Sequence, residues 1–247
     1  MNSAVIIIPA RLHSTRLPRK LLLKETGKSV LEHTFLAASR STLATRTMIA
    51  TDHEDIVAEA RRFGAEAVMT DPNAASGTDR VAEVAASLAD ADIIVNVQGD
   101  EPELAPASID QVIRQLASDP AAVMATLATP IRTLASLNDP NCVKVTIRKD
   151  GRAAYFSRSP IPHVRRDFDE GDERIEGLLT QDPPLFLQHL GLYAYRRDFL
   201  MRLSKLAPTP YERLEKLEQL RVLESGFAIQ VGLINEPSIG IDTAADY

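Results

Sequence analysis

Nine short apolar runs are spread along the chain, and the early ones are separated by segments with helical spacing. The runs lie at residues 5–8, 47–50, 65–69, 92–97, 122–128, 143–147, 153–157, 189–195 and 228–234. The helical patterns lie near residues 29–40, 55–62, 78–88 and 108–117. Short continuous strands that alternate with helices are typical of a mostly parallel sheet covered on both faces. The pattern therefore predicts an α/β fold with a doubly wound, mostly parallel sheet.

The order of elements changes between residues 141 and 195. Strand patterns follow one another there with little helix between them, and a polar, acid-rich stretch over residues 165–184 interrupts them. We expect a smaller antiparallel, strand-rich insertion with a long loop, inside a single domain that spans residues 1–247. The insertion would form a second lobe or a contact with another copy of the chain.

The composition argues against several classes of protein. With 45% hydrophobic residues, the 247-residue chain can bury a sizeable core. A net charge of −6 argues against a general nucleic-acid binder. The single cysteine, Cys142, rules out an internal disulfide and a cysteine-based zinc site, and no apolar run is long enough to cross a membrane. We expect a cytoplasmic protein that binds neither nucleic acid nor membrane.

Positive charge is concentrated directly after the first apolar run. Six basic residues and one acid, Glu25, lie between Arg11 and Lys28. Ligands of an open α/β sheet bind at the carboxyl ends of its strands, and this loop begins at such an end. Because arginine and lysine match phosphate oxygens, the loop predicts a polyphosphate site; a solvated basic loop is the alternative.

Two familiar phosphate-binding motifs do not fit this loop. Residues 26–30 read TGKSV, but Leu22 stands where a P-loop has its first glycine. The dinucleotide fingerprint needs spaced glycines after the first strand, and the loop has none before Gly27. A nicotinamide-dependent dehydrogenase is therefore not expected.

Two aspartates follow apolar stretches and are candidate metal ligands. Asp100 comes after the run at residues 92–97, at the sheet edge where the basic loop begins. Magnesium binds carboxylates together with water and substrate phosphates, so Asp100 predicts a magnesium site there; a turn aspartate is the alternative. Asp242 is a second candidate near the C-terminus, and its alternative is an ordinary helix N-cap.

Polar side chains alternate along the run at residues 189–195. A strand would place His189, Gly191, Tyr193 and Tyr195 on one face, with three apolar side chains on the other. The small Gly191 leaves a gap between polar neighbours that suits a polyol or a carboxylate. A core histidine packed between tyrosines is the alternative.

One long helix is expected over residues 211–226, with Gly226 just beyond its end. Helical spacing places Glu218 and Arg221 within its apolar side. Either the two form an ion pair, or Glu218 and Gln219 reach into a polar pocket.

Two further stretches carry candidate binding residues. Arg158 follows the run at residues 153–157 and could anchor an acidic substrate, or be solvated or ion-paired. Residues 75–80 read ASGTDR before a helix, which allows close approach of a nucleobase or ribose, or a plain helix cap.

Taken together, these stretches resemble a known family, the cytidylyltransferases that activate 3-deoxy-manno-octulosonate (Kdo), also called CMP-Kdo synthetases. The motifs appear in family order at residues 7–20, 50–56, 76–80, 95–102, 155–162, 189–195, 214–226 and 240–243. The resemblance implies a fold of the nucleotide-diphospho-sugar transferase type and a homodimer. It also implies a magnesium-dependent reaction of CTP with Kdo, an acidic 3-deoxy sugar, that gives CMP-Kdo and pyrophosphate for lipopolysaccharide synthesis.

The resemblance also implies roles for individual residues. Arg11 and Lys20 would hold the triphosphate, with Ser14 and Arg16 nearby. The cytidine would be read by Ser76, Gly77, Thr78 and Arg80. The Mg²⁺ ligands would be Asp100 and Asp242, which with Lys20 and Arg11 form the expected catalytic set. The sugar pocket would be lined by Gln98, Arg158, His189, Tyr193, Glu218 and Gln219.

The sequence departs from the family pattern at two places, and two other functions remain as alternatives. Arg19 stands where many relatives have glycine, and the stretch over residues 165–184 is longer than expected. The same chemistry on 8-amino-Kdo or a sialic acid is one rival. A nucleotide-sensing binding protein without turnover is the other.

Overall fold

The computed structural model describes residues 3–14, 16–165, 173–235 and 240–247. In this part of the chain one sheet contains nine strands, and each of the nine predicted runs falls in one of them. The strands are β1 (Ala4–Ala10), β2 (Ala44–Thr51), β3 (Glu66–Met69), β4 (Ile93–Asn96), β5 (Ala122–Pro130), β6 (Lys144–Ile147), β7 (Ala153–Ser157), β8 (Leu187–Arg196) and β9 (Ala228–Leu233).

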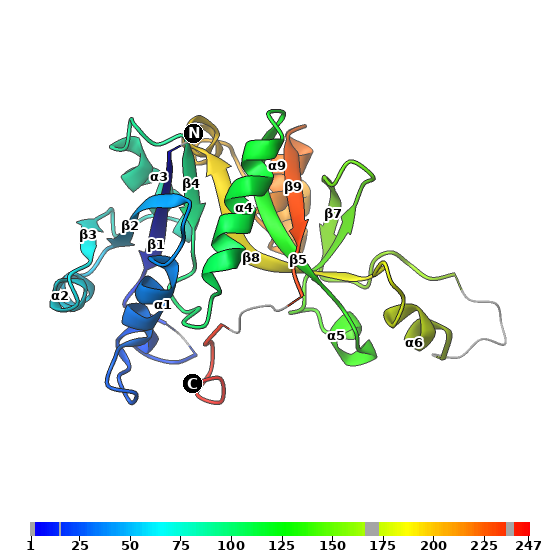
Figure 1. Ribbon diagram of the computed structural model, residues 1–247, viewed down its shortest axis with the longest axis horizontal. Helices are drawn as coiled ribbons and strands as arrows, with labels where there is room; N and C mark the ends of the chain where they lie inside the picture. The colour runs from blue at the N-terminus through cyan, green and yellow to red at the C-terminus, as the bar shows by residue number, and fades with distance from the viewer. Residues whose placement is uncertain (1–2, 15, 166–172, 236–239) are drawn as a thin grey trace.

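The sheet is mixed but mostly parallel. Its strand order is β3-β2-β1-β4-β8-β5-β9, and β6 and β7 extend it beside the start of β8. The pairs within β1 to β4 and the pair of β5 with β9 are parallel, whereas β8 is antiparallel to β4 and β5, and β7 to β6. The predicted fold class is confirmed. Of the strand-rich segment over residues 141–195, β8 lies in the middle of the main sheet, and β6 and β7 lie at its side (Figure 1).

Helices cover both faces of the sheet. The helices are α1 (Val30–Ala38), α2 (Glu54–Arg62), α3 (Gly77–Ala86), α4 (Pro106–Ser118), α5 (Leu134–Asn138), α6 (Glu173–Leu179), α7 (Arg197–Leu203), α8 (Pro210–Glu215) and α9 (Gln219–Glu224), with a short 3₁₀ helix, η1, at Lys20–Leu22. The first four agree with the predicted helical patterns. In the described part of the chain, no helix combines the length and apolar character that crossing a bilayer requires.

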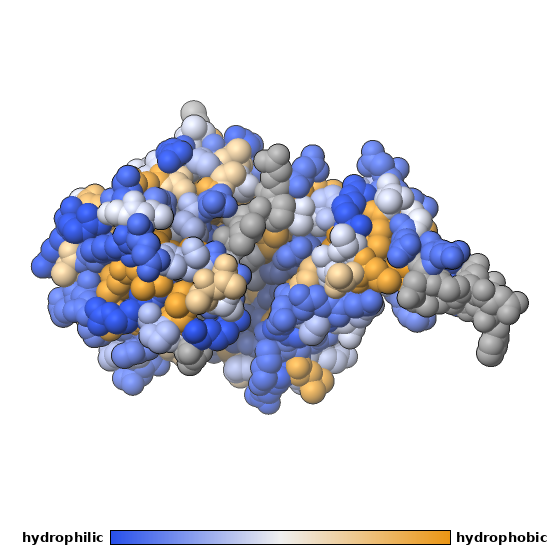
Figure 2. Space-filling view, turned by 90° about the horizontal axis from the view of Figure 1, so that it is seen from below, coloured by the Kyte–Doolittle hydropathy of each residue, from blue (hydrophilic) through white to orange (hydrophobic). Residues whose placement is uncertain are grey.

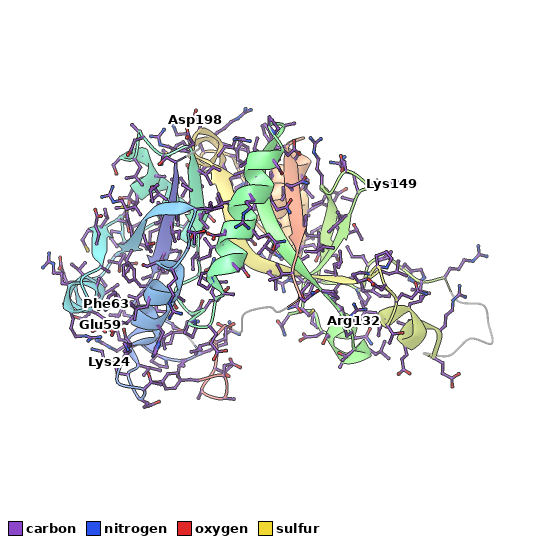
Figure 3. All side chains as sticks on the ribbon, in the orientation of Figure 1. Lys24, Glu59, Phe63, Arg132, Lys149 and Asp198 are labelled. Atoms are coloured by element: carbon purple, nitrogen blue, oxygen red, sulfur yellow. The ribbon has the colours of Figure 1, made fainter. Side chains whose placement is uncertain are left out.

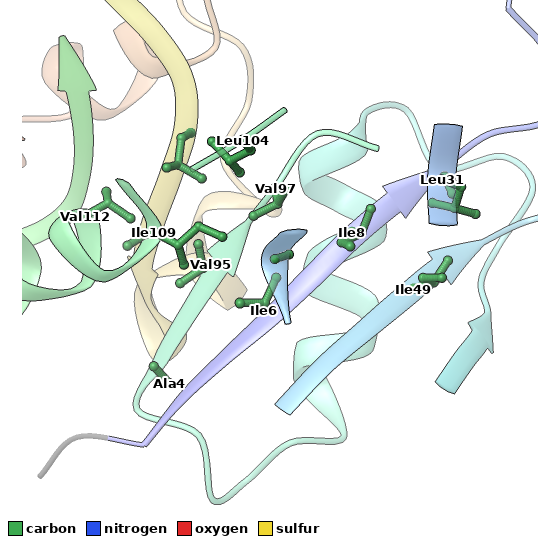
Figure 4. Packing of buried hydrophobic residues seen from close by; sticks show 14 of the residues in the cluster. Ala4, Ile6, Ile8, Leu31, Ile49, Val95, Val97, Leu104, Ile109 and Val112 are labelled. Atoms are coloured by element: carbon green, nitrogen blue, oxygen red, sulfur yellow. The ribbon is translucent and has the colours of Figure 1, made fainter. Parts of the chain in front are cut away.

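Alternation along β1 shows why both faces need cover. Ile6 and Ile8 point into a cluster with Leu31 of α1 and Ile109 of α4, as Figure 4 shows. Val5 and Ile7 point to the other face of the sheet and belong to the second cluster, which α3, α7 and α9 cover. Because a strand's side chains alternate between faces, a strand that is apolar at every position must be buried on both sides.

The helix expected over residues 211–226 is broken, so this prediction was wrong. Lys216 adopts a left-handed conformation, with φ 54° and ψ 46°, and separates α8 from α9. The side chain of Arg158 donates to the carbonyl oxygens of Glu215 at 2.7 Å and of Lys216 at 3.5 Å. These bonds occupy carbonyls that a continuing helix would use. The predicted C-terminal glycine is confirmed, since Gly226 has φ 80° and follows Ser225, the C-cap of α9.

A small arm, formed by α5 and α6, projects from the main body (Figure 1). It has its own apolar cluster, which includes Ile131, Ile175 and Phe186. Arg132, labelled in Figure 3, donates to the carbonyl oxygens of Leu179 and Gln181 at 3.0 Å each. The arm contains the described part of the acid-rich stretch; residues 166–172 of that stretch lie outside the described residues.

Candidate active site

Two neighbouring hollows lie at the carboxyl ends of β1 and β4. The first, about 520 Å³, will be called the nucleotide hollow. The second, about 390 Å³, will be called the sugar hollow. Gly77 and Gln98 line both, so the two hollows meet there. Figure 2 views the molecule from below Figure 1, toward the edge of the sheet at which β1 ends.

The nucleotide hollow collects most of the residues expected to bind the triphosphate and the metal. Its predicted lining residues are Arg11, Ser14, Arg16, Lys20, Ser76, Gly77, Gln98, Asp100 and Asp242. Ala75, the first residue of the predicted stretch 75–80, lines it as well, and so does His13, which was not predicted. His13 lies next to Ser14 in the predicted basic loop, and that position was the available signal.

The two aspartates meet at one ammonium group. Nζ of Lys20 donates to Oδ2 of Asp100, to Oδ1 of Asp242 at 3.0 Å and to the carbonyl oxygen of Ile241 at 2.9 Å. Arg16 lies 3.0 Å from the other carboxylate oxygen of Asp242. Burial alone would lower the pKa of Lys20, but the hydrogen bonds and charges of both carboxylates outweigh it and raise the pKa above its usual value. Lys20 is therefore a permanent cation between two anions.

Asp242 does not cap a helix. The local bonds of a cap go to Asp246 instead, whose Oδ2 accepts from the backbone nitrogens of Asp242 at 3.0 Å and Thr243 at 2.7 Å. Residues 243–246 form a turn, and the carboxylate of Asp242 faces Lys20 and Arg16. This excludes the capping alternative for Asp242.

The carboxylates of Asp100 and Asp242 suit a magnesium ion. Both are hard oxygen donors around one position that now carries a positive charge. Among the described residues, no group of three or more acidic, histidine or cysteine side chains could form a complete protein-built metal site. Magnesium is commonly bound by one or two carboxylates, with water and phosphate completing its shell, so two carboxylates beside a phosphate-sized hollow fit it.

Two basic residues of the opening loop point away from the nucleotide hollow. Arg19 pairs with Asp55 at 2.7 Å, and Lys24 pairs with the buried Glu59 at 2.6 Å. Figure 3 shows Lys24 and Glu59 together at one corner of the molecule. These pairs attach the loop to α2, while Arg11, Arg16 and Lys20 line the hollow.

The stretch expected to read cytidine is divided between different surroundings. Ser76 caps α3 by accepting from the nitrogen of Asp79 at 3.0 Å, and it also lines the nucleotide hollow. Thr78 donates to Glu218 at 2.8 Å at the sugar hollow. Arg80 is fully buried and pairs with Asp52 at 2.7 Å, so it is not among the lining residues of either hollow.

The sugar hollow contains the polar face of β8. The predicted alternation is confirmed: Tyr193 and Tyr195 pack on the α3 side of the sheet, whereas Leu192 and Ala194 pack on the α4 side. His189 is buried against Phe156, with 4.9 Å between ring centroids, and its Nε2 lies 3.1 Å from Oγ1 of Thr126.

His189 fits both alternatives predicted for this strand, a packed core histidine and a residue that lines a binding site. It packs in the core, and it also lines the sugar hollow beside Gly191 and Tyr193. Burial lowers the pKa of His189 to about 3, so the imidazole is neutral at physiological pH.

Glu218 and Gln219 reach the sugar hollow, as one of the two alternatives predicted. The ion-pair alternative was wrong, because Arg221 pairs with Glu212 and Glu218 accepts from Thr78. Burial raises the pKa of Glu218, although the hydrogen bond from Thr78 lowers it in part. The break at Lys216 is what places Glu218 at the start of α9, facing the hollow.

Arg158 is not among the lining residues of the sugar hollow. Its guanidinium donates to backbone carbonyls, including that of Pro140 at 2.9 Å, and so supports the chain on two sides of that hollow. Asn96, Asn141, Val143, Lys216 and Leu217 line the hollow and were not predicted. For Asn96 a signal existed: it is the one polar residue in the apolar stretch at residues 93–97.

Comparisons with known proteins agree on the family. A sequence model of the cytidylyltransferase family matches residues 5–230. The 3-deoxy-manno-octulosonate cytidylyltransferase of Rhodopirellula baltica is 46% identical, over 98% of this chain and 95% of its own. That of Geobacter metallireducens is 47% identical, over 97% of this chain and 93% of its own.

A solved structure agrees as well. It is that of CMP:2-keto-3-deoxy-manno-octonic acid synthetase complexed with CTP, and it superposes with a TM-score of 0.88 and 37% identity, covering 99% of this chain and 95% of its own. The chain therefore belongs to the cytidylyltransferases and, within them, to the 3-deoxy-manno-octulosonate cytidylyltransferase family.

Proposed function

We propose that this protein transfers CMP from CTP to the anomeric C2 hydroxyl of Kdo and releases pyrophosphate, for lipopolysaccharide synthesis. The observation that carries the proposal is the meeting of Asp100 and Asp242 at Lys20, beside a hollow that adjoins a second, polar hollow. Relatives of similar length that bear this activity in their names support it.

The nucleotide hollow would hold the triphosphate of CTP. Arg11, Arg16 and Lys20 place positive charge along it, and phosphoryl transfer depends mainly on charge neutralisation and alignment. Ser76 and Gly77 would approach the cytidine.

Asp100 and Asp242 would hold a magnesium ion, which supplies Lewis-acid charge at the reacting phosphate when bound. Lys20 and Arg16, which now pair with these carboxylates, would add positive charge beside the phosphates. Because the two hollows meet at Gly77 and Gln98, a nucleotide in one and a sugar in the other would be aligned for in-line attack at the α-phosphorus.

The sugar hollow would hold the acid sugar through hydrogen-bonding side chains. His189 is neutral, and burial raises the pKa of Tyr193, so its hydroxyl keeps its proton. Together with Gln98, Glu218 and Gln219, these groups suit the hydroxyls of a polyol. Arg158 would act on this site indirectly, by holding the chain at Lys216.

We also propose a cytoplasmic homodimer, in which the arm contacts a second copy. Leu185 at the base of the arm is 46% exposed, and Figure 2 shows hydrophobic surface where the arm leaves the body. Light scattering should give the mass of a dimer for the wild type and of a monomer for Leu185→Glu. An unchanged dimer in this variant would exclude the arm as the contact.

The function is tested by incubating purified protein with CTP, Mg²⁺ and one acid sugar at a time, and following pyrophosphate release. The panel is Kdo, 8-amino-Kdo and a sialic acid. We expect the highest kcat/KM with Kdo. A higher value with another sugar would change the substrate, and CTP binding without pyrophosphate release would favour a nucleotide-sensing protein.

A further inference from the structure

Asp246 binds the backbone of Asp242 on both sides of its Cα atom. Oδ2 of Asp246 accepts from the backbone nitrogen of Asp242 at 3.0 Å, from that of Thr243 at 2.7 Å and from Oγ1 of Thr243 at 3.0 Å. The two nitrogens precede and follow the Cα of Asp242, so these bonds restrict the φ and ψ angles of that residue. The rotamers open to a side chain depend on its φ and ψ angles. Asp246 therefore constrains where the carboxylate of Asp242 points.

The C-terminal segment, drawn in red in Figure 1, is attached to the rest of the molecule at two other places. Before the turn, Ile241 is buried, and its backbone nitrogen donates to the carbonyl oxygen of Asp100 at 2.8 Å. After it, the hydroxyl of Tyr247 accepts from a backbone nitrogen of the basic loop at 2.9 Å. Loss of the Asp246 carboxylate should therefore leave the segment in place and affect mainly the orientation of Asp242.

The carboxylate of Asp242 has contacts of its own, but a bound nucleotide would share them. Its oxygens lie 3.0 Å from Lys20 and 3.0 Å from Arg16. Under the proposed function both cations also face the phosphates of CTP, so they would bind Asp242 less closely once CTP is present. The bonds that Asp246 accepts come from backbone nitrogens and a hydroxyl, and a phosphate or a metal ion does not compete for them. A carboxylate suits this position, because hydrogen bonds to an ionised acceptor are about twice as strong as those between neutral groups.

We propose that Asp246 is a positioning residue for the magnesium site: by accepting from the nitrogens on both sides of the Asp242 Cα, it keeps the carboxylate of Asp242 directed toward Asp100. Asp246 acts through Asp242 and is not itself a metal ligand. This assignment rests on the proposed function, because it takes Asp100 and Asp242 as the ligands of a magnesium ion.

The test measures Mn²⁺ binding in the presence of CTP and without a sugar, from the electron paramagnetic resonance signal of free Mn²⁺. Asp246→Ala should raise the Kd for Mn²⁺ about 10-fold, as expected when a ligand loses the support of charge-assisted hydrogen bonds. Asp246→Asn keeps an oxygen that can accept the same bonds, so its Kd should stay within about threefold of the wild-type value.

The control is Asp71→Ala, which should leave the Kd for Mn²⁺ unchanged. It removes another exposed aspartate that closes a turn, by accepting from the backbone nitrogen of Asn73 at 2.8 Å, and it lies outside both hollows. Thermal unfolding shows whether each variant is folded. An aspartate that only closed its own turn would change the unfolding temperature at either position and the Kd for Mn²⁺ at neither.

An unchanged Kd for Mn²⁺ in folded Asp246→Ala would overturn the proposal. Equal losses in Asp246→Ala and Asp246→Asn would also overturn it, since the charge of Asp246 and not its hydrogen bonds would then be responsible. If Asp246→Ala does not fold, a crystal structure of the wild type with CTP and Mn²⁺ decides. Asp246 bonded to both nitrogens while Asp242 binds the metal supports the assignment, and Asp246 turned away from them overturns it.

Asp100→Asn, measured in the same way, separates this assignment from the proposed function. If Asp100→Asn binds Mn²⁺ as tightly as the wild type, the proposed metal site fails, and the role of Asp246 fails with it. If Asp100→Asn weakens Mn²⁺ binding and Asp246→Ala does not, the metal site stands and only the role of Asp246 is wrong.

Discussion

The backbone nitrogen of Ile241 donates a 2.8 Å hydrogen bond to the carbonyl oxygen of Asp100. This bond joins the turn after β4 to the C-terminal segment and brings Asp242, the next residue, beside Asp100. Lys20 strengthens the junction by binding both carboxylates and the carbonyl oxygen of Ile241. The candidate metal site thus depends on a contact between segments that are far apart in the sequence.

Replacing either aspartate should stop the reaction without unfolding the protein. We expect Asp100→Asn and Asp242→Asn each to lower kcat/KM by about 100-fold or more, because each would remove a charged ligand of the proposed magnesium ion. Pyrophosphate release and thermal unfolding measure the two effects. Asp198→Asn is the control, since the side chain of Asp198 is 97% exposed at the far end of the molecule (Figure 3). Near-normal turnover in Asp100→Asn would count against the metal role.

The backbone at Arg19 should prefer glycine. Its φ of 55° and ψ of 27° are left-handed, which costs a residue with a side chain about 1 kcal/mol. Arg19→Gly and Arg19→Ala both lose the pair with Asp55, so their difference isolates the backbone. We expect the glycine variant to be more stable by about 1 kcal/mol in urea unfolding. At Arg114, inside α4, alanine should instead be the more stable. The same order at both positions would contradict this account.

Glu59 should make stability depend on acid pH. Burial alone would raise its pKa, but hydrogen bonds from Arg62 and Lys24 outweigh burial and lower the pKa to about 2. A carboxylate with a lowered pKa stabilises the fold above its unfolded value of about 4.5, and this contribution is lost as the pH falls toward 2.

Glu59→Gln should therefore lower the free energy of unfolding by about 2 kcal/mol at pH 7, and the difference should shrink below pH 4.5. Glu66→Gln, which breaks the exposed pair with Arg46, should cost less than about 1 kcal/mol. A pH-independent difference for Glu59→Gln would show that its charge is not responsible.

His189 should also make the protein lose stability as the pH falls, but in a higher pH range than Glu59. Its pKa in the folded protein is about 3, because burial disfavours the charged form. Below pH 6.5 the unfolded chain binds a proton that the folded protein cannot, so the wild type loses stability as the pH falls. Relative to His189→Asn, the loss should total about 2 kcal/mol between pH 7 and pH 5 and approach about 1.4 kcal/mol per pH unit at the acid end of that range, measured by urea unfolding. Equal slopes for the two proteins would mean that His189 titrates normally.

The sheet was predictable because each strand can be recognised from its own apolar residues. Continuous apolar runs, such as Ile6 to Ile8, are buried on both faces, and no distant contact is needed to recognise them. The two hollows were also foreseeable in outline, since ligands collect at the carboxyl edge of such a sheet.

Features that depend on distant partners were not predictable. The break at Lys216 is stabilised by Arg158, far away in the sequence, and helical periodicity continues through it unchanged. The inward position of Arg80 likewise depends on Asp52 in another loop. For Asp242, spacing favoured a helix cap, and only the bond between Ile241 and Asp100 shows that its carboxylate turns toward Lys20.

The most direct test of the central claim is an anomalous difference map from crystals grown with CTP and Mn²⁺. Mn²⁺ replaces Mg²⁺ here because it gives an anomalous X-ray signal. The account predicts a manganese peak in contact with the carboxylates of Asp100 and Asp242, with the triphosphate against Arg11 and Lys20. Manganese bound elsewhere, or a triphosphate outside this hollow, would contradict it.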